Sequence, residues 1–257
     1  MPELPEVETL CRQLQMRIAG KKISSTEVYD AKLNNLKNIQ GKRITAVKRK
    51  GKTMEINLDD GTSVQIHLRM TGRLLWQSEK ERPKHSRWKM NFEDGAIYLI
   101  DPRRFATIKI QKWENDKVDN DLLVSFARED FLAKNGGRKG KIKNILMDQK
   151  AVAGIGNIYA CEILYRCGIH PERTAESLNM KNWQLIFKNA GIILKKAIEN
   201  RGTSISDWRD LDGRKGENQH ELKAYGREGK KCMKCGEAIK RIKQGGRSTF
   251  YCPQCQI

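Results

Sequence analysis

The sequence predicts a mixed α+β fold that is divided into more than one domain. An apolar pattern at helical spacing opens the chain, and short β-prone runs separated by turns follow up to about residue 112. Helical patterns dominate after about residue 120, and two Cys-x-x-Cys pairs lie near the C-terminus. We therefore expect an N-terminal helix with an antiparallel β-sandwich, then a helical domain, then a small β-hairpin stapled by a metal ion.

The first predicted element is an amphipathic helix over residues 5–19. Its apolar positions recur every three or four residues, at Val7, Leu10, Cys11, Leu14 and Ile18. This spacing places them on one helical face, which is expected to be buried. Gly20 follows the last of them and is a typical helix end.

Residues 22–112 are predicted to form β-structure. Runs of β-prone residues are bounded by turns such as Asp59-Asp60-Gly61 and Glu93-Asp94-Gly95. The clearest runs are Thr53–Leu58, Ser63–Leu68, Trp88–Phe92 and Ala96–Ile100. Several short strands at this spacing predict an antiparallel sandwich or barrel.

The chain beyond about residue 120 is predicted to be helical. Helices are expected at Asp121–Lys134, Lys141–Asp148, Asn157–Cys167 and Asn182–Asn200. The Gly- and Lys-rich stretch at residues 134–140 is expected to be a flexible linker or hinge. The stretch from about residue 207 to 220 is rich in Gly, Lys, Arg and Asp and is expected to form a mobile loop.

The composition indicates a polyanionic partner. The 257 residues include 50 Lys and Arg against 31 Asp and Glu, which gives a formal net charge of +19. Basic residues cluster in three blocks, at residues 42–52, 134–150 and 223–247, and this clustering favours nucleic acid over an evenly charged surface. An anionic membrane surface is the second choice. No apolar run approaches the length of a membrane span, and no apolar signal segment is present near Met1.

Four of the seven cysteines form the clearest site in the sequence. Cys232 and Cys235 make one Cys-x-x-Cys pair, and sixteen residues further on Cys252 and Cys255 make another. Two such pairs predict one tetrahedral, all-thiolate Zn²⁺ site, which is structural because it has no open ligand position. The odd total argues against a disulfide framework and favours a reducing compartment. The other three cysteines are expected to be buried thiols on helices: Cys11, Cys161 and Cys167.

The N-terminus offers a nucleophile beside carboxyl groups. Aminopeptidase removes an initiator Met that precedes proline, so we expect the mature chain to begin with the secondary amine of Pro2. An α-amino group, with a pKa of about 8, is neutral far more often at physiological pH than a lysine, with a pKa of about 10.4. A neutral secondary amine condenses with an aldehyde-like carbon to give an iminium ion. Glu3 and Glu6 stand close to this amine in the sequence. The alternative is that Pro2 and Pro5 merely stiffen a helix entry.

Two glycine-containing segments are candidate phosphate sites. Gly154-Ile155-Gly156 immediately precedes the helix predicted at Asn157–Cys167. Backbone N–H groups and the helix dipole can hold a phosphate there, although a plain turn between helices has the same pattern. Gly51-Lys52-Thr53 resembles the end of a nucleotide-binding P-loop, but Ala46 occupies the position of the leading glycine that this loop requires. We therefore reject nucleotide binding at Lys52.

Six motifs in order carry a family resemblance. They are Met1–Thr9, His67–Gly72, Asp101–Phe105, Gly154–Asn157, Glu221–Arg227 and the four-cysteine finger. Together they extend over essentially the whole chain and closely resemble bacterial formamidopyrimidine-DNA glycosylases, which repair oxidised purines. The resemblance implies a helix and β-sandwich domain at residues 1–130, a helix–two-turn–helix DNA-binding domain at 131–222 and a zinc finger at 223–257.

The resemblance implies a catalytic set. Pro2 would attack C1′ of the damaged nucleotide and form a Schiff base, and Glu3 would act as general acid and base at the sugar ring oxygen. Glu6 would help to arrange this end of the site, although helix capping is its ordinary role. Lys52 would bind the phosphate next to the lesion, and Arg247 would hold a phosphate from the zinc hairpin. β- and δ-elimination would then cut the strand on both sides of the lost base.

The resemblance also implies a DNA-binding set. His67 and Asn157 match further phosphate contacts, and Lys143 of the basic block at residues 134–150 joins them. Extruding a nucleotide costs roughly a few kcal/mol, and side chains should fill the gap that it leaves. Three residues match this void-filling set: Met70, Arg103 and Phe105. Arg103 would pair with the orphaned cytosine, whereas Met70 and Phe105 have ordinary core positions as the alternative.

A lesion-reading loop is implied at about residues 211–219. Many family members carry an aromatic pair after the glycine of this loop, but here Glu217 and Asn218 follow Gly216. Main-chain N–H groups would then be the remaining means of reading the modified base.

Three functions remain open on the sequence. The first is a bifunctional DNA glycosylase and AP lyase for 8-oxoguanine and formamidopyrimidines in double-stranded DNA. An endonuclease VIII-like enzyme for oxidised pyrimidines is the nearest alternative, but Glu3-Leu4-Pro5 and the void-filling set favour the purine enzyme. A non-catalytic zinc protein that binds damaged DNA leaves Pro2 and Glu3 unexplained. In each case we expect a bacterial cytoplasmic protein, associated with the nucleoid through DNA, for which a monomer is sufficient.

Overall fold

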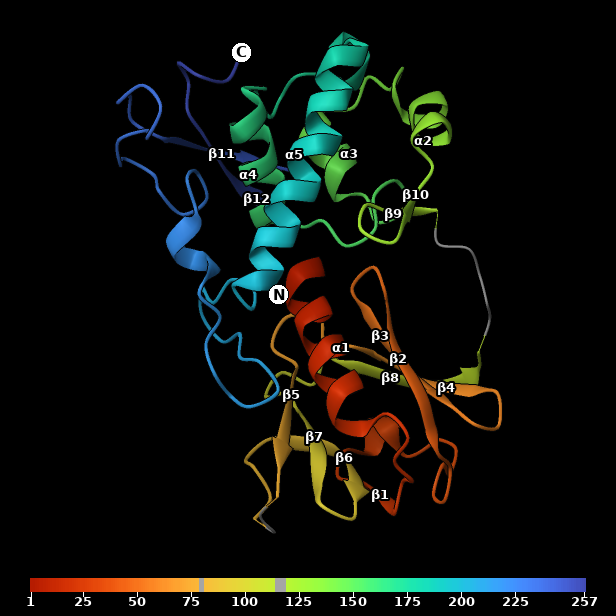
Figure 1. The fold of residues 1–257 in the computed structure, drawn as a ribbon. Helices are drawn as coiled ribbons and strands as arrows, with labels where there is room; N and C mark the ends of the chain where they lie inside the picture. The colour runs from red at the N-terminus through yellow and green to blue at the C-terminus, as the bar shows by residue number, and fades with distance from the viewer. Residues whose placement is uncertain (79–80, 114–118) are drawn as a thin grey trace. The chain divides into compact units, whose positions relative to one another are not determined.

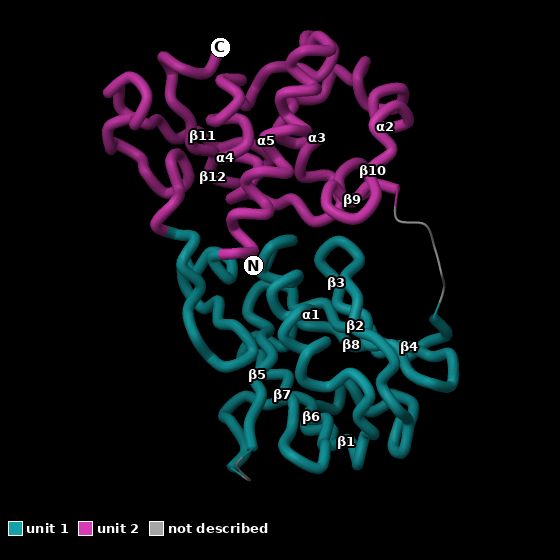
Figure 2. The backbone as a smooth tube through the Cα atoms, in the orientation of Figure 1, with its two compact units in different colours: residues 1–116, 200–219 teal, residues 117–199, 220–257 magenta. Residues whose placement is uncertain are grey.

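The computed structural model describes residues 1–78, 81–113 and 119–257, and the chain forms two compact units. Unit 1 contains residues 1–116 and 200–219, and unit 2 contains residues 117–199 and 220–257 (Figure 2). Residues 79–80 and 114–118 of the predicted N-terminal domain lie outside the described residues. The chain therefore returns to unit 1 for one short segment before it ends in unit 2.

Two four-stranded antiparallel sheets form most of unit 1 (Figure 1). One sheet has the order β1 (Ser25–Val28), β6 (Ser86–Phe92), β7 (Gly95–Ile100) and β5 (Arg73–Gln77). The other has the order β2 (Ile44–Lys50), β3 (Thr53–Leu58), β4 (Thr62–His67) and β8 (Thr107–Lys112). A short 3-10 helix, η1 (Ala31–Leu33), follows β1. The predicted antiparallel sandwich is confirmed.

The predicted N-terminal helix is confirmed as α1 (Leu4–Ile18), which packs against β2 and β3. Its apolar face is buried in a core that both sheets share, with Met54 and Ile66 from one sheet and Met90 and Leu99 from the other. Burying such side chains contributes about 1.5–3 kcal/mol each, so this core fixes the position of the helix on the sheets. The N-terminal residues are thereby held beside the sandwich.

The returning segment at residues 200–219 belongs to the same core. Trp208 and Leu211 are buried among the core side chains of unit 1. Asp210, also buried, accepts hydrogen bonds from the backbone N–H of Arg214 and from the side chain of Gln13 in α1. As the sequence predicts, this segment contains no helix or strand up to η3 (Asn218–Glu221). It is nevertheless tied to α1 by specific contacts.

Unit 2 is mainly helical. Its helices are α2 (Arg128–Asn135), α3 (Ile142–Met147), α4 (Asn157–Cys167) and α5 (Met180–Glu199), with the short 3-10 helix η2 (Ala175–Ser177). An aromatic cluster joins α2 to α5 through the rings of Phe131, Trp183 and Phe187. The zinc hairpin consists of β11 (Lys240–Gln244) and β12 (Arg247–Tyr251), and β12 packs against α4.

One predicted helix is wrong in its first half. The segment predicted as helix from Asp121 instead forms the two-stranded ladder of β9 (Asn120–Asp121) and β10 (Ser125–Phe126), and α2 begins only at Arg128. The carboxylate of Asp121 accepts the N–H of Leu123, and such local side-chain bonds compete with helical ones. Residues 134–140, predicted as a linker or hinge, connect α2 with α3 inside unit 2.

Among the described residues, no helix is both long enough and apolar enough to cross a membrane. Cys11 and Cys161 are buried as predicted, whereas Cys167 at the end of α4 is only half-buried.

Candidate active site and zinc centre

The predicted nucleophile and its two carboxylates lie at the start of α1. Pro2, Glu3 and Glu6 are all buried, whereas Met1, which precedes Pro2, is half-exposed. Glu3 is the N-cap residue of the helix, and Glu3 and Glu6 form a reciprocal capping box. In it the backbone N–H of Glu3 donates to Oε2 of Glu6 at 2.8 Å. The ordinary capping role that the sequence allows for Glu6 is therefore present.

Glu6 also has a second partner, which sequence reasoning missed. Its Oε1 accepts the backbone N–H of Thr203 at 2.7 Å. Gly202 lies so close that a Cβ atom there would stand 2.8 Å from Cγ and Oε1 of Glu6. A small residue at this position is the only sign of the contact in the sequence. One carboxylate thus joins the N-terminal segment to the segment that leads into the predicted lesion-reading loop.

The predicted lesion-reading loop is attached to the same segment. The backbone N–H of Glu217 donates to the carbonyl of Asn200, and its carboxylate lies 3.4 Å from the guanidinium of Arg201. Asn218 is buried and its side-chain N–H donates to the hydroxyl of Thr203 at 2.8 Å. The side chain of Asn218 therefore points toward the segment that leads into the loop.

Lys52 lies in the two-residue turn of the hairpin formed by β2 and β3. The turn is fastened to α1, because Arg49 bonds Glu8 of that helix at 2.8 Å and also the carbonyl of Gly51. Lys52 itself is 7% exposed. A buried ammonium needs a counter-charge or polar partners, so this position differs from a solvated surface lysine.

His67 lies directly across from Thr53, the residue after Lys52, in the pairing of β3 with β4. Burial, and then the charges of Arg69 and Lys52, lower the pKa of His67 to about 4, so its imidazole is neutral at pH 7. Nδ1 accepts the backbone N–H of Arg69 at 3.0 Å. The ring proton must therefore reside on Nε2, and this N–H can donate a hydrogen bond to a phosphate oxygen.

The predicted void-filling residues lie on two neighbouring connections of unit 1. Met70, between β4 and β5, is 49% exposed, and Phe105, between β7 and β8, is 46% exposed. The guanidinium of Arg103 lies over the Phe105 ring, 4.6 Å from its centroid. The alternative for Met70 and Phe105, that they are core residues, is therefore wrong, because large apolar side chains in a core are buried.

In unit 2, the predicted residues Asn157, at the start of α4, and Lys143, in α3, contact each other. The Nζ of Lys143 donates to Oδ1 of Asn157 at 2.6 Å and to the hydroxyl of Thr249 in β12 at 2.8 Å. Asn157 in turn donates to the carbonyl of Ser248. Lys143 is completely buried, and both contacts hold its ammonium beside Asn157. Its DNA-binding role stays a prediction.

Arg247 lies at the start of β12, beside the tight turn of the zinc hairpin. Its side chain is exposed, and the next residue, Ser248, supplies the carbonyl that Asn157 contacts. The structure therefore brings Arg247 and Asn157 to the same end of unit 2, although they come from segments 90 positions apart (247 − 157). Their predicted phosphate contacts are compatible with this position.

The four predicted zinc ligands converge on one point. The Sγ atoms of Cys232, Cys235, Cys252 and Cys255 all lie within 4.8 Å of one another. Two pairs are 3.9 Å and 3.5 Å apart. A tetrahedron with Zn–S bonds of about 2.3 Å requires S···S distances of about 3.8 Å, so this thiolate set fits one structural Zn²⁺. Backbone N–H groups of Lys234 and Cys255 donate to Sγ of Cys232 and Cys252, which orients these ligands.

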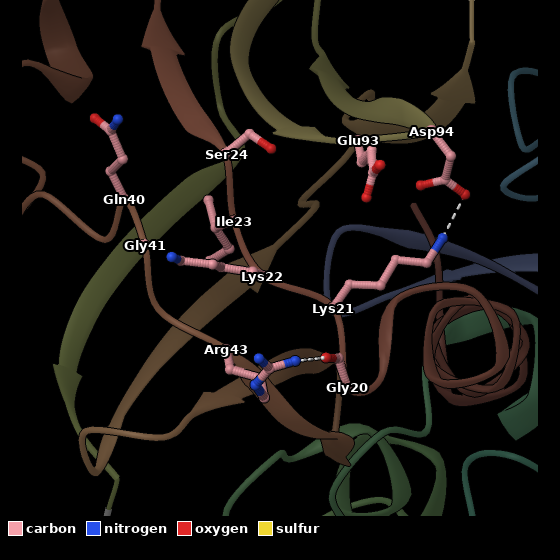
Figure 3. A pocket seen from close by; sticks show the side chains of 10 residues that line it. All are labelled: Gly20, Lys21, Lys22, Ile23, Ser24, Gln40, Gly41, Arg43, Glu93 and Asp94. Carbon is pink, nitrogen blue, oxygen red and sulfur yellow. Dashed lines mark hydrogen bonds and ion pairs between the residues drawn. The ribbon is translucent and has the colours of Figure 1, made fainter.

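A hollow of about 710 Å³ in unit 1 lies elsewhere (Figure 3). Lys21 in its wall pairs with Asp94 at 2.5 Å, and Arg43 donates to the carbonyl of Gly20. None of the predicted catalytic, DNA-binding or metal residues lines it. It therefore does not form part of the candidate site.

Three domain families match the chain in succession. Residues 1–108 match the formamidopyrimidine-DNA glycosylase N-terminal domain, residues 118–208 match the formamidopyrimidine-DNA glycosylase H2TH domain, and residues 229–257 match the zinc finger found in FPG and IleRS. Together these matches include the capping box of α1, the start of α4 and the four cysteines. The mixed α+β architecture predicted from the sequence is confirmed.

Named relatives extend the likeness to the full chain. The chain is 40% identical to the formamidopyrimidine-DNA glycosylase of Pelotomaculum thermopropionicum, over 100% of this chain and 99% of that protein. It is also 40% identical to that of Carboxydothermus hydrogenoformans, over 100% of both. A Lactococcus lactis FPG mutant in complex with a Fapy-dG containing DNA has a TM-score of 0.91 and 35% identity over 99% of each chain. MutM in complex with carbocyclic 8-oxo-G containing DNA has a TM-score of 0.89 at 35% identity, again over 99% of each chain. This chain therefore belongs to the formamidopyrimidine-DNA glycosylase family.

Proposed function

We propose that this protein is a base-excision repair DNA glycosylase with AP lyase activity, which removes oxidised purines from double-stranded DNA. The observation that carries the proposal is similarity over the whole chain. The solved relatives hold DNA that contains Fapy-dG, an abasic site or carbocyclic 8-oxo-G, and each aligns with 99% of this chain. The substrate and the reaction are therefore those of the relatives, carried out by the residues described above.

The chemistry begins with the Pro2 amine after Met1 is removed. Its nitrogen attacks C1′ of the damaged nucleotide, the bond from C1′ to the base breaks, and the base leaves with a proton. Opening of the sugar ring at its C1′–O4′ bond gives an iminium ion, which acts as an electron sink. Loss of a proton from C2′ expels the 3′ phosphate, and loss of a proton from C4′ expels the 5′ phosphate. Hydrolysis of the imine then releases the enzyme.

At the N-terminus, Glu3 would act in acid–base catalysis and Glu6 would act in positioning. Glu3 lies next to the amine and would donate a proton to the sugar ring oxygen as the ring opens. Glu6 accepts hydrogen bonds from the backbone of Glu3 and from that of Thr203, so it would fix the position of the amine relative to the lesion-reading loop. A general acid must lie within hydrogen-bond reach of the atom that it protonates. The N-terminus of α1 holds Glu3 in one position and so meets this requirement.

Phosphate contacts would come from both units. In unit 1 we assign Lys52 as the cationic contact and the Nε2–H of His67 as a neutral donor. In unit 2 we assign Asn157 and Arg247, with Lys143 holding Asn157 in place. Such contacts fix the register of a protein on DNA without reading sequence.

The zinc ion would supply no reaction step. Its four cysteine ligands fill the tetrahedral positions, and the metal stabilises the hairpin that presents Arg247. Because the proposed substrate is chromosomal DNA, we also propose that the protein works in the bacterial cytoplasm in association with the nucleoid.

The proposal is tested by comparing release of two lesions in single-turnover reactions. We expect 8-oxoguanine opposite cytosine to be excised and the strand to be cut, with thymine glycol processed more slowly. Faster release of thymine glycol would instead favour an endonuclease VIII-like enzyme. Tight binding of both duplexes without strand cleavage, by protein whose N-terminus is confirmed as Pro2, would favour a non-catalytic damage-binding protein.

A further inference from the structure

Asp101, at the end of β7, is a buried carboxylate that the proposed chemistry does not use. Only 1% of the residue is exposed. Its Oδ2 accepts the backbone N–H groups of Phe105 and Ala106 at 2.6 Å and 2.7 Å, and its Oδ1 accepts that of Arg103 at 3.2 Å. One side chain therefore fixes the connection that carries two of the three void-filling residues.

The same carboxylate reaches the connection that carries the third void-filling residue. The hydroxyl of Thr71, next to Met70, donates to Oδ1 of Asp101 at 2.5 Å. The two connections are also in close contact, because a Cβ atom at Gly72 would stand 2.8 Å from the Cβ of Ala106. Met70 and Phe105 therefore lie on segments that Asp101 and this contact join.

A series of charged side chains that begins with Arg87 extends from Asp101. Arg87 of β6, also buried, directs Nη1 to the carbonyl of Ala106 at 2.6 Å and to Oδ2 of Asp101 at 3.5 Å. Its Nε donates to Asp30 at 2.6 Å, and Asp30 in turn pairs with Arg104. The charges of this relay alternate in sign, so each buried ion has an opposite neighbour.

Backbone strain marks the same two connections. Arg69 and Arg104 adopt left-handed conformations, with φ of 57° and 58°. Each directly precedes an exposed apolar residue, Met70 in one case and Phe105 in the other. Such conformations are unfavourable for a residue with a side chain and persist only where surrounding contacts enforce them. Next to Arg104, the bond from the N–H of Phe105 to Asp101 is a contact of that kind.

We propose that Asp101 is a positioning residue that couples the two void-filling connections, so that Met70, Arg103 and Phe105 enter the DNA stack as one rigid unit. This assignment rests on the proposed function. Holding the three side chains in advance removes the entropy that they would otherwise lose on entering the duplex. Asp101 also fixes the backbone of Arg103. The guanidinium of Arg103 lies over the Phe105 ring and would set the preference for the base opposite the lesion.

Asp101 keeps its charge throughout the neutral range. Burial acts to raise its pKa, but the hydrogen bonds from Ala106, Thr71, Phe105 and Arg103 outweigh it and lower the pKa overall. Replacement by asparagine therefore removes a negative charge that the wild-type side chain carries at neutral pH. It keeps the size of the side chain but removes one of the two acceptor oxygens.

The test is Asp101→Asn on three substrates, which are 8-oxoguanine opposite cytosine, 8-oxoguanine opposite adenine, and single-stranded DNA with an abasic site. On 8-oxoguanine opposite cytosine we expect single-turnover cleavage to slow about ten- to a hundredfold, the range expected when a hydrogen bond to a charged group is lost. On single-stranded DNA with an abasic site there is no gap to fill, so the rate should stay within about twofold. The preference for cytosine over adenine opposite the lesion should also fall. A purely structural role would slow all three substrates together.

Asp59→Asn is the matched control, because Asp59 is exposed in a turn of the same unit and carries the same charge. It should leave all three rates unchanged. Thr71→Val removes only the hydrogen bond between Asp101 and the connection that carries Met70. This variant replaces Asp101→Asn as the test if Asp101→Asn does not fold, and we expect the same selective loss in smaller degree. Equal loss on paired and single-stranded substrates, or no loss on either, would overturn the assignment. Wild-type protein that cleaves none of the substrates would instead overturn the proposed function.

Discussion

Glu6 and Thr203 are joined by a hydrogen bond of 2.7 Å although they lie 197 positions apart in the sequence. The other oxygen of the same carboxylate accepts the N–H of Glu3, beside the proposed nucleophile. The Glu6 carboxylate thus links the backbone of Glu3 to the segment that leads into the predicted lesion-reading loop. Changes at residues 200–203 should therefore affect the chemistry at Pro2.

Gly202→Ala tests this link. The new methyl group would lie 2.8 Å from the Glu6 carboxylate, so either Glu6 or the segment must move. We expect the free energy of unfolding to fall by about 1–3 kcal/mol more than in the control, as overpacking of buried sites does. Gly213→Ala is that control, because Gly213 has the same φ of 80° but its Cβ would meet only Leu75 at 3.5 Å. Equal effects in urea denaturation of the two variants would contradict the link.

His67 should make stability depend on pH. Burial, with Arg69 and Lys52, lowers its pKa to about 4 in the folded chain, whereas an unfolded histidine titrates near about 6.5. Between these values the unfolded chain binds a proton that the folded chain does not, so the free energy of unfolding falls as the pH is lowered from about 6.5 to about 4. The stability difference between wild type and His67→Gln should be constant above pH 7 and decrease below about 6.5. Denaturation curves that show a constant difference down to about pH 4.5 would contradict this pKa.

Removal of one zinc ligand should disrupt the hairpin. We expect Cys252→Ser to lose zinc and to bind DNA at least about tenfold more weakly, since structural zinc supplies folding free energy. Cys167→Ser is the control, because that half-buried thiol lies outside the four-cysteine cluster. Zinc content and fluorescence anisotropy measure the two effects. Full zinc content with unchanged affinity in Cys252→Ser would refute the site.

Arg247 and Lys143 should differ in their effect on salt dependence. Arg247→Ala removes an exposed cation, so the slope of log affinity against log salt should become shallower by about one ion. Lys143→Met removes a buried ammonium and leaves Asn157 and Thr249 without it, which should cost about 1–3 kcal/mol of stability but leave the slope unchanged. A shallower slope in Lys143→Met would show that Lys143 contacts phosphate after all.

Local pattern was enough to predict several elements. The strand at Thr53–Leu58 and the helix at Asn157–Cys167 occupy the predicted residues, because turn residues and glycines bound them on both sides. The zinc ligands were also predictable, since the spacing of cysteines alone specifies the site. The first half of the helix predicted from Asp121 is wrong because Asn120 and Asp121 satisfy backbone groups with their side chains.

Long-range contacts account for what the sequence did not reveal. The bonds from Glu6 to Thr203 and from Asp101 to Thr71 join segments whose approach depends on the packing of unit 1. Lys143 belongs to a basic block that suggests an exposed face, but the fold turns it inward toward Asn157. Neither residue type nor spacing distinguishes a buried lysine from a phosphate-binding one.

The central claim, nucleophilic attack by Pro2, is tested most directly by borohydride trapping. Protein with a confirmed Pro2 terminus is incubated with a duplex that contains 8-oxoguanine opposite cytosine, reduced, digested and mapped by mass spectrometry. We expect a stable adduct between DNA and the N-terminal peptide, joined at the nitrogen of Pro2. An adduct at a lysine, or tight binding without any adduct, would contradict the assigned nucleophile.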